Sequence, residues 1–360
     1  MAKVIFCGTL GKEEKNSWDK TNGFFFRALS SQATCYHLDY SPENAVIKKA
    51  HKILSGIIYG ETLVRDPIYD FLLEHKFKKY YNKLCLTPDL IIHSSTVCVP
   101  CGYEKKCPHV LYTDASIMGG VRYNNLNPSA KAMALFTKET KKYIDRLKLV
   151  FSFNEWTRRS LIEDFNIEEK KVVNVGFGAN LNPYQGPKDY SNKEILIVLR
   201  RGLEKNKGLL LLLEAFKEAF KKDPAIKLSV VGTTLEKIEG VTYYEGYPRE
   251  KTIELFQQAS LFAMPALFEP NGMVYIEALA CKTPILGLNR LAFPEFSGYG
   301  KYGFIVDENR DNIAQVILEA LNKPELLRTM GEEGQIYVSG RFDWDIVIKK
   351  ILQTSILTAI

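Results

Sequence analysis

Two carboxylates, Glu269 and Glu277, stand eight residues apart in a stretch that could bind a polyhydroxylated, phosphorylated ligand. The stretch covers residues 261–288 and reads LFAMPALFEPNGMVYIEALACKTPILGL. The apolar spacing predicts a helix after Asn271-Gly272, whose N-terminal amides and dipole favour an anion. Glu269 then lies on the loop before the helix and Glu277 in its second turn. An ordinary strand-loop-helix with a solvated Glu269 is the alternative that periodicity leaves open.

The run EPNGMVYIEALACKTP resembles the E-x7-E signature of the group 1 retaining glycosyltransferases, which have the two-domain GT-B fold. By this resemblance Glu277 binds the ribose hydroxyls of a sugar nucleotide, and Glu269 lies against the donor sugar. The turn between them is expected to hold the phosphates and the sugar, through Asn271, Gly272, Met273 and Val274. Lys282 departs from the family pattern, where a glycine is usual, but it does not alter the two glutamates.

A second match lies in RRGLEKNKGLLLLLEAF, where the family has glycine-arginine, a short loop and lysine-glycine opening a helix. Arg201 and Lys207-Gly208 fit this pattern, with one residue more between them than is usual. The resemblance implies a nucleoside diphosphate leaving group, whose developing charge two preorganised cations can neutralise without a metal. Arg201, Lys207, Glu269 and Asp114 are therefore the catalytic candidates. A basic turn that merely solvates the helix entrance is the alternative.

The family resemblance also assigns roles to residues that follow the ends of predicted strands. Gly8 and Thr9 follow the first strand, where the matching family loop faces the donor phosphate and the acceptor. Asp114 follows the strand HVLYT, about where many members have a histidine near the reactive carbon of the sugar. Its role stays open among orienting the acceptor hydroxyl, orienting the donor sugar and capping the next segment. Tyr247, in a turn that borders the nucleotide base, is expected to stack on that base.

The elements that must position these residues alternate as strand and helix twice over, and 360 residues are about two domains' worth. This pattern predicts an α/β protein with two doubly wound, Rossmann-like domains facing each other across a cleft. We expect an N-terminal, acceptor-side domain over residues 1–180 and a C-terminal, donor-side domain over residues 181–345. Residues 346–360 are expected to form a helix that packs back on the first domain.

The net charge of +6 is uneven, since residues 1–185 carry +7 and the remainder −1. Residues 77–84 and 129–150 concentrate the excess, with aromatic residues interleaved. Such segments favour either a solvated helix face or peripheral contact with an anionic membrane. No nucleic-acid motif is present, and no apolar run approaches the ~20 residues of a membrane span. The opening MAKVIFCGTL reads as a strand and not a signal peptide, so we expect a cytoplasmic protein, with the inner membrane face as its peripheral site.

Three cysteines and a histidine form one group, Cys98, Cys101, Cys107 and His109. Their spacing, C-x2-C-x5-C-x-H, fits either a zinc site or a loop of reduced thiols, and the sequence does not decide between them.

The resemblance as a whole implies a retaining, metal-independent, hexosyltransferase-type glycosyltransferase without a cofactor. The donor is expected to be a nucleoside diphosphate sugar, with a UDP-sugar favoured, and the acceptor a hydroxyl of a glycan, glycolipid or polysaccharide precursor. Two alternatives are a catalytically silent GT-B-like partner subunit and a sugar-nucleotide epimerase. The silent subunit would be expected to lose the charged set, whereas Arg201, Lys207, Glu269 and Glu277 are all present.

Overall fold

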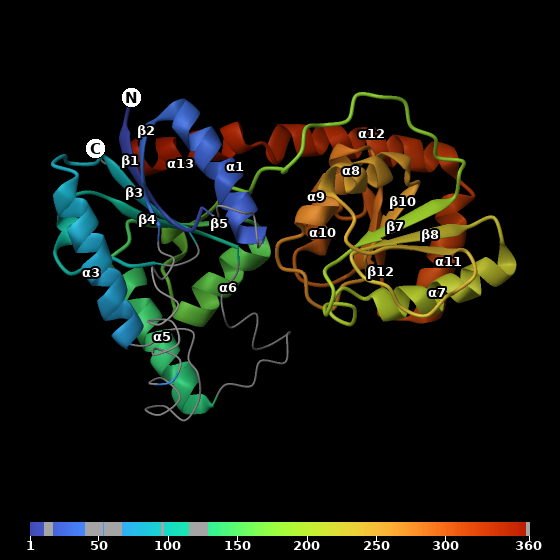
Figure 1. Ribbon diagram of the computed structural model, residues 1–360, viewed down its shortest axis with the longest axis horizontal. Coiled ribbons are helices and arrows are strands. Elements are labelled where there is room, and N and C mark those ends of the chain that lie inside the picture. The colour runs from blue at the N-terminus through green and yellow to red at the C-terminus, as the bar shows by residue number, and fades with distance from the viewer. Residues whose placement is uncertain (11–16, 40–52, 54–66, 95–96, 115–128, 358–360) are drawn as a thin grey trace. The chain divides into compact units, whose positions relative to one another are not determined.

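The computed structural model describes residues 1–10, 17–39, 53, 67–94, 97–114 and 129–357 (Figure 1). The chain divides into two compact units. Unit 1 comprises Met1–Gly178 together with Trp344–Ile360, and unit 2 comprises Ala179–Asp343. Each unit has its own sheet, its own covering helices and its own apolar core.

In its described residues, unit 1 contains one six-stranded sheet in which all strands are parallel, in the order β2-β1-β3-β4-β5-β6. The strands are β1 (Lys3–Cys7), β2 (Thr34–Leu38), β3 (Leu90–Ser94), β4 (His109–Thr113), β5 (Leu149–Ser152) and β6 (Val172–Asn174). The central strands β3, β4 and β5 are buried along their whole length, as expected for a parallel sheet covered on both faces.

Helices cover both faces of the unit 1 sheet. They are α1 (Ser17–Gln32), α3 (Pro67–Lys83), α5 (Ala130–Ile144), α6 (Glu155–Phe165) and α13 (Trp344–Leu357), with short 3-10 helices η1 (Tyr103–Lys105) and η2 (Glu169–Lys171). Figure 1 shows α13, in red, beside α1. Phe25 of α1 stacks on Phe6 of β1 at 5.3 Å and meets Trp344 of α13 edge-on at 5.9 Å. The other face packs against α3, α5 and α6, where Phe77 and Tyr143 are fully buried.

Unit 2 likewise has six parallel strands in one sheet, in the order β12-β11-β10-β7-β8-β9. The strands are β7 (Glu194–Val198), β8 (Lys227–Val231), β9 (Val241–Tyr244), β10 (Leu261–Ala263), β11 (Ile285–Leu288) and β12 (Gly303–Val306). The helices are α7 (Leu209–Lys222), α8 (Arg249–Gln258), α9 (Met273–Ala280), α10 (Phe293–Phe296), α11 (Arg310–Leu321) and α12 (Pro324–Arg341). Helices α7 and α11 cover one face of the sheet, and α8, α9 and α12 cover the other (Figure 1).

The strand order locates the edge at which each sheet can bind a ligand. In unit 2 the order reverses between β7 and β10, because the chain moves outward from β7 in one direction and returns to β10 on the other side. In unit 1 the reversal lies between β1 and β3. Open parallel sheets bind ligands outside the carboxyl ends of the strands at this switch point. The loops after β7 and β10 are therefore the first places to look for a site in unit 2.

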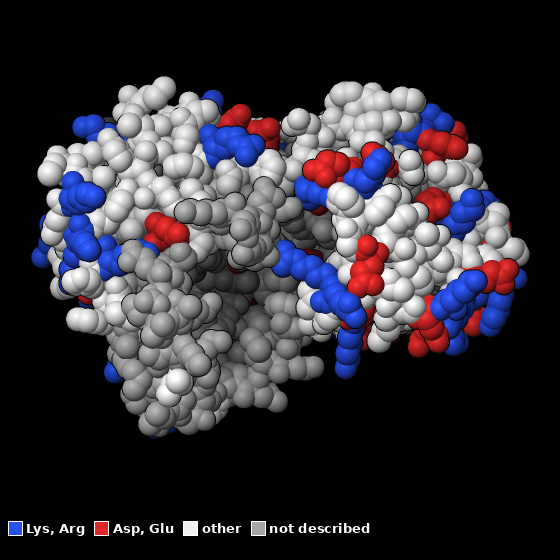
Figure 2. Space-filling model, viewed as in Figure 1, with Lys and Arg blue, Asp and Glu red and all other residues white. Residues whose placement is uncertain are grey.

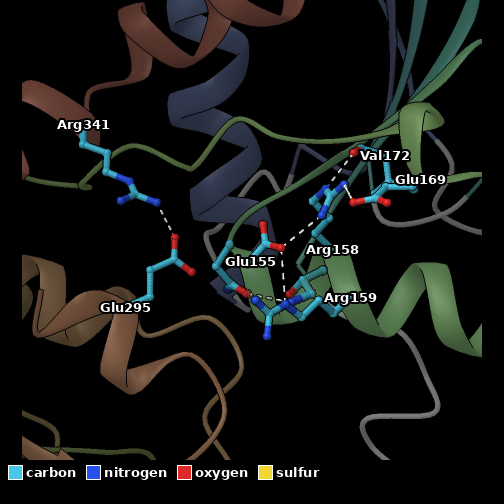
Figure 3. Close-up of polar contacts among 9 residues, drawn as sticks. Glu155, Arg158, Arg159, Glu169, Val172, Glu295 and Arg341 are labelled. Carbon is cyan, nitrogen blue, oxygen red and sulfur yellow. Dashed lines mark hydrogen bonds and ion pairs between the residues drawn. The ribbon is translucent and has the colours of Figure 1, made fainter. Parts of the chain in front are cut away.

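Figure 3 shows two charged clusters, one in each unit, that support the fold. Arg158 on α6 binds the carboxylates of Glu155 and Glu169 at 3.1 and 2.7 Å and donates to the carbonyl of Val172 at 3.0 Å (Figure 3). Since Val172 opens the edge strand β6, this guanidinium occupies a backbone acceptor that an edge would otherwise expose. In unit 2, Arg341 pairs with the largely buried Glu295 (Figure 3).

The predicted fold class is confirmed: both units are doubly wound α/β structures, and the C-terminal helix α13 belongs to unit 1. Alternation of strands and helices indicated this class, but it did not indicate that the two sheets have different strand orders. Among the described residues, no helix combines the length and the apolar character that a bilayer crossing would require.

Candidate functional site

The loops after β7 and β10 are joined at the switch point of unit 2. The carbonyl of Asn206 accepts the amides of Leu267 and Phe268 at 2.9 and 3.2 Å. Gly208 has a φ of +73°, and a Cβ there would lie 1.9 Å from the carbonyl oxygen of Pro265. Only glycine permits both this left-handed conformation and this close approach. The two loops are therefore held in one relative position by backbone contacts.

Lys207 and Glu269 form an ion pair between these loops. Both side chains are largely covered, with 19% and 13% of their surfaces exposed. The second carboxylate oxygen of Glu269 accepts the amides of Gly272 at 3.0 Å and Asn271 at 3.2 Å. Burial by itself would raise the pKa of Glu269, but the Lys207 charge and these hydrogen bonds hold that pKa below its ordinary value. Glu269 is therefore an ionised side chain bound on both oxygens.

The helix predicted after Asn271-Gly272 is confirmed as α9, with Met273 and Val274 as its first residues. Gly272 caps it with a φ of +60°, and a Cβ there would come within 2.0 Å of the Phe296 ring. The amides of Asn271 and Gly272, expected to bind a ligand phosphate, instead bind Glu269 in this structure. The anion position at the start of α9 is thus filled by the chain's own carboxylate.

Glu277 lies in the second turn of α9, as predicted, with 5% of its side chain exposed. Its Oε1 accepts a hydrogen bond from the guanidinium of Arg249 at 2.7 Å. The same Nη2 atom of Arg249 donates to the carbonyl of Asn180 at 3.0 Å. A buried carboxylate two turns from Glu269 is therefore neutralised by an arginine from a neighbouring helix.

A buried lysine holds α8 and α9 together at their other ends. The ammonium of Lys188 donates to the carbonyls of Phe256 and Gln257 in the last turn of α8, at 2.8 and 3.0 Å, and to Cys281 at the end of α9, at 3.2 Å. A cation at two helix C-termini complements both helix dipoles. Burial lowers the pKa of Lys188 to about 7. The pair of helices that carries Arg249 and Glu277 is thereby fixed at both ends.

Arg201 and Tyr247 are also predicted for the donor site. Arg201 lies in the loop after β7, and Tyr247 follows the carboxyl end of β9. Arg201 is 78% exposed and binds Glu245 at 2.8 Å. The ring of Tyr247 packs against Tyr244 with 4.7 Å between centroids. Among the described contacts, neither side chain touches Lys207 or Glu269. The structure therefore brings Lys207, Glu269 and the start of α9 together but leaves Arg201 on the surface.

The predicted residues of unit 1 lie at the carboxyl ends of β1 and β4. Asn22 of α1 donates to the carbonyl of Thr9 at 2.9 Å and accepts the hydroxyl of Ser94, at the end of β3, at 2.6 Å. A Cβ at Gly8 would lie 3.1 Å from Ser94. Asn22 and Ser94 thus connect the two strands at the switch point of unit 1, a link that the sequence analysis missed. 

Asp114 lies elsewhere on the same edge of the unit 1 sheet. The hydroxyl of Thr157, in the first turn of α6, donates to the carbonyl of Asp114 at 2.6 Å. Thr157 also gives its amide to the side chain of Asn154, the N-cap of α6, at 2.8 Å. These hydrogen bonds connect the backbone at the end of β4 to the start of α6. They therefore fix the backbone position from which the Asp114 side chain projects.

Arg249 is the main residue of the unit 2 site that sequence reasoning missed, because 28 residues separate it from Glu277. One signal was available. Arg249 follows Pro248 at the first position of a predicted helix, where the helix dipole disfavours a cation. A cation in such a position calls for an anion from another element.

The cysteine group does not come together as a metal site in the described part of the chain, where no three His, Cys, Asp or Glu side chains could hold an ion. Cys98 and Cys107 are buried in the unit 1 core, whereas Cys101 is exposed. His109 is buried, and its Nδ1 lies 2.9 Å from Nε2 of His93. Burial lowers the pKa of His109 to about 3.

Comparison with known proteins identifies the unit that holds this site. Residues 185–336 match the family model of glycosyl transferases group 1. Unit 2 is similar to this family over nearly its whole length. The match spans Lys207, Glu269, Glu277 and Arg249, although it covers less than half of the whole chain. It bears out the family resemblance of the sequence.

Two curated relatives each match about two fifths of this chain. A D-inositol 3-phosphate glycosyltransferase of Segniliparus rotundus is 30% identical over 41% of this chain and 36% of the relative. A GDP-mannose-dependent alpha-(1-6)-phosphatidylinositol monomannoside mannosyltransferase of Mycolicibacterium smegmatis is 28% identical over 42% of this chain and 45% of the relative. The chain thus matches about two fifths of the length of these relatives.

Solved structures extend the likeness to the whole chain at the level of the fold. A glycosyltransferase of Rickettsia africae has a TM-score of 0.67 at 16% identity, covering 100% of this chain and 99% of that one. Anabaena HepE, solved in complex with UDP, has a TM-score of 0.67 at 15% identity, covering 99% and 100%. The likeness to these neighbours extends over both units, as the predicted GT-B fold requires.

Proposed function

We propose that this protein is a retaining, metal-independent glycosyltransferase that moves a hexose from a nucleoside diphosphate sugar to an acceptor hydroxyl. The observation that carries the proposal is the pairing of Lys207 with Glu269 at the N-terminus of α9, at the switch point of the unit 2 sheet. A cation, a carboxylate and a helix N-terminus meet there, and the buried Glu277 lies two turns along the same chain segment. These groups match the phosphate, sugar and ribose parts of such a donor.

The donor would enter by exchanging one anion for another. Its diphosphate would take the Lys207 ammonium that Glu269 now binds, so that no bare cation is exposed at any stage. Glu269, together with the amides at Met273 and Val274, would then hold the sugar, while Glu277 accepts the ribose hydroxyls. Arg201 would have to leave Glu245 to reach the phosphates, which its 78% exposure permits. Lys207 is thus the primary cation for the leaving group.

In the proposed step, the bond between the anomeric carbon and the diphosphate oxygen breaks, and its electron pair stays with the diphosphate. The acceptor oxygen bonds to the same face of the carbon, and its proton passes to the departing phosphate oxygen. Lys207 stabilises the negative charge that develops, in a site where both it and Glu269 are largely shielded from water. Gly8, Thr9 and Asp114 of unit 1 are proposed for the phosphate and acceptor side.

We propose a UDP-sugar as the first donor to test. HepE, which shares the fold, was solved with UDP, whereas the Mycolicibacterium smegmatis relative depends on GDP-mannose. Tyr247, beside the end of β9, would stack on the base, which does not by itself distinguish uracil from guanine. The sugar nucleotides UDP-glucose, GDP-mannose and ADP-glucose therefore form the minimal panel.

The activity test measures release of nucleoside diphosphate from each donor with a chelator present, using lipid and glycan acceptors, and NMR of the product gives its anomeric configuration. We expect one donor to react, to give a product with the anomeric configuration of the donor, and to fail with Lys207→Ala and Glu277→Ala. Full activity in either variant, or an inverted product, would contradict the proposal. A protein that interconverts sugar nucleotides without transfer would be the epimerase instead.

As a second proposal, unit 1 makes peripheral contact with the inner face of an anionic membrane. The exposed side of α3 carries Phe71, 70% exposed, and Leu72 near its start, and Lys78, Lys79 and Lys83 toward its end. Figure 2 shows basic side chains over the part of unit 1 where α3 lies. Apolar insertion next to lysines is the chemistry that binds an anionic bilayer surface. A glycolipid acceptor would be consistent with such a location.

Co-sedimentation with vesicles of anionic and of neutral lipid, at low salt, tests the membrane proposal. We expect retention on anionic vesicles only, reduced by Phe71→Ser and by Lys78→Glu. Ile336→Ser, which removes a similarly exposed apolar side chain from unit 2, is the matched control. Equal recovery of the wild-type protein in the supernatant with both lipids would contradict it.

A further inference from the structure

Arg249 stands where two parts of unit 2 meet around Glu277. Its guanidinium binds the Glu277 carboxylate at 2.7 Å and the carbonyl of Asn180 at 3.0 Å. Glu277 is 5% exposed, so its rotamer is set by this partner and by the packing of α9. Asn180 lies at the start of unit 2, on the segment that precedes β7. A single side chain thus links that segment, α8 and α9.

The two oxygens of the Glu277 carboxylate are used differently. Oε1 accepts the Arg249 hydrogen bond, and no described residue donates to Oε2. A carboxylate fixed through one oxygen presents the other, with two lone pairs, in one direction. That geometry suits a ligand carrying two adjacent hydroxyl groups.

We propose that Arg249 is a positioning residue that fixes Glu277 to read the 2′,3′-diol of the donor ribose. This inference rests on the proposed function, since it assigns the way in which the donor site selects a ribonucleotide. Arg249 binds one carboxylate oxygen and leaves the other for the diol. Without Arg249, only the packing of α9 constrains the rotamer of Glu277, and a ribonucleotide loses its advantage over the 2′-deoxy form.

Arg249 lies at an electrostatically unfavourable position, which supports a functional role for this residue. It occupies the first position of α8, where the positive end of the helix dipole disfavours a cation. The buried carboxylate of Glu277 offsets that cost. The ion pair nevertheless keeps charged groups at a buried site where apolar side chains would often make the fold equally or more stable. Lys188 fixes the opposite ends of α8 and α9, so the helix pair has a stabilising cation that is independent of Arg249.

Two variants separate positioning from general support of the fold. Arg249→Met removes the guanidinium but keeps much of the apolar stem, and Arg249→Lys keeps the charge with a different reach. Arg328→Met is the matched control, because Arg328 pairs with Glu325 on α12 in the same unit, at 3.3 Å. Thermal unfolding of each variant shows whether it is folded at the temperature of the binding experiment.

The experiment is calorimetric titration of the full chain with UDP, GDP and ADP and with the 2′-deoxy form of whichever binds. For the wild type and Arg328→Met we expect the ribonucleotide to bind about tenfold more tightly than the 2′-deoxy form. For Arg249→Met we expect the ratio to fall to within about twofold of one, through weaker ribonucleotide binding, with the 2′-deoxy affinity unchanged. Arg249→Lys is expected to give an intermediate ratio.

Each outcome decides a different point. An unchanged ratio in Arg249→Met would overturn the positioning role while leaving the donor site in place. Equal loss of both nucleotides would also overturn it, because it would indicate a phosphate contact or a general loss of structure. If Arg249→Met does not fold, the ratio measured for Arg249→Lys decides the question in the same way. Failure of the wild type to bind any of the three nucleotides would contradict the proposed function itself.

Discussion

Lys207 and Glu269 lie 62 residues apart in the sequence and form an ion pair between the loops that follow β7 and β10. The carboxylate also accepts the amides of Asn271 and Gly272, so it neutralises a lysine and the start of a helix at once. A phosphorylated ligand would need the same donors. We therefore propose the pair as the ligand-free form of a phosphate site.

The first prediction concerns the strength of the Lys207–Glu269 pair. In a double-mutant cycle with Lys207→Met and Glu269→Gln, we expect a coupling free energy of about 2 kcal/mol, because both side chains are largely shielded from water. Urea unfolding measures it, with Lys251 and Glu254, an exposed pair on α8, as the control cycle. A coupling as small as that of the exposed pair would contradict the account.

The second prediction concerns competition for Lys207. Because Glu269 holds the ammonium that the diphosphate needs, Glu269→Gln should bind the free nucleoside diphosphate about fivefold more tightly. Transfer of the sugar should fall at the same time, since the carboxylate that contacts the sugar is lost. Titration calorimetry and the transfer assay check the two effects. Weaker nucleotide binding in Glu269→Gln would show that Glu269 does not compete with the phosphates.

The third prediction follows from the pKa of Glu269, which lies below its ordinary value of 4.5. A carboxyl group with a lowered pKa in the folded state stabilises the fold fully above its ordinary pKa, and this contribution is lost as the pH falls through the lower, folded-state value. The difference in unfolding free energy between wild type and Glu269→Gln should therefore be constant above about pH 5 and shrink below about 4.5. A difference that changes between pH 6 and 8 would contradict it.

The fourth prediction separates close approach from backbone strain. Gly208→Ala places a Cβ against the carbonyl of Pro265, whereas Gly202, with a φ of +86°, has no atom within 4 Å of such a Cβ. Gly202→Ala should cost about 1 kcal/mol of unfolding free energy from strain alone. Gly208→Ala should cost more and also abolish nucleotide binding, because it separates the two loops. Equal effects of the two substitutions would contradict the close-approach argument.

The fifth prediction concerns the buried His93–His109 pair of unit 1. Burial lowers the pKa of His109 from 6.5 to about 3, so between these values the unfolded chain binds a proton that the folded chain does not. Stability should therefore fall as the pH drops below about 6.5, by up to ~1.4 kcal/mol per pH unit. Urea unfolding should show a smaller slope for His109→Gln and an unchanged slope for His75→Gln, an exposed histidine on α3.

The sequence predicted the parts of the site that are local in the chain. The spacing of Glu269 and Glu277 around Asn271-Gly272 determines which lies on the loop and which on the helix, because helix geometry is the same everywhere. The positions of Lys207 and Gly208 before an apolar helical run likewise placed them at the start of α7. These inferences needed no knowledge of long-range contacts.

The parts that the sequence did not predict depend on which elements become neighbours. Arg249 meets Glu277 only because α8 packs beside α9, and Asn22 meets Ser94 only because β1 lies next to β3. No local pattern encodes either pairing. The expectation for Arg201 came from a motif whose loop is one residue longer here, and the side chain pairs with Glu245 on the surface.

The most direct test of the central claim is calorimetric titration with UDP, GDP and ADP, each with a chelator present, on the wild type and on Lys207→Ala. We predict that one nucleotide binds the wild type without a metal and that this binding is lost in a folded Lys207→Ala protein. Binding of none of the three by the intact wild-type fold, or binding that persists unchanged in Lys207→Ala, would contradict a donor site at Lys207 and Glu269 and would favour a catalytically silent subunit.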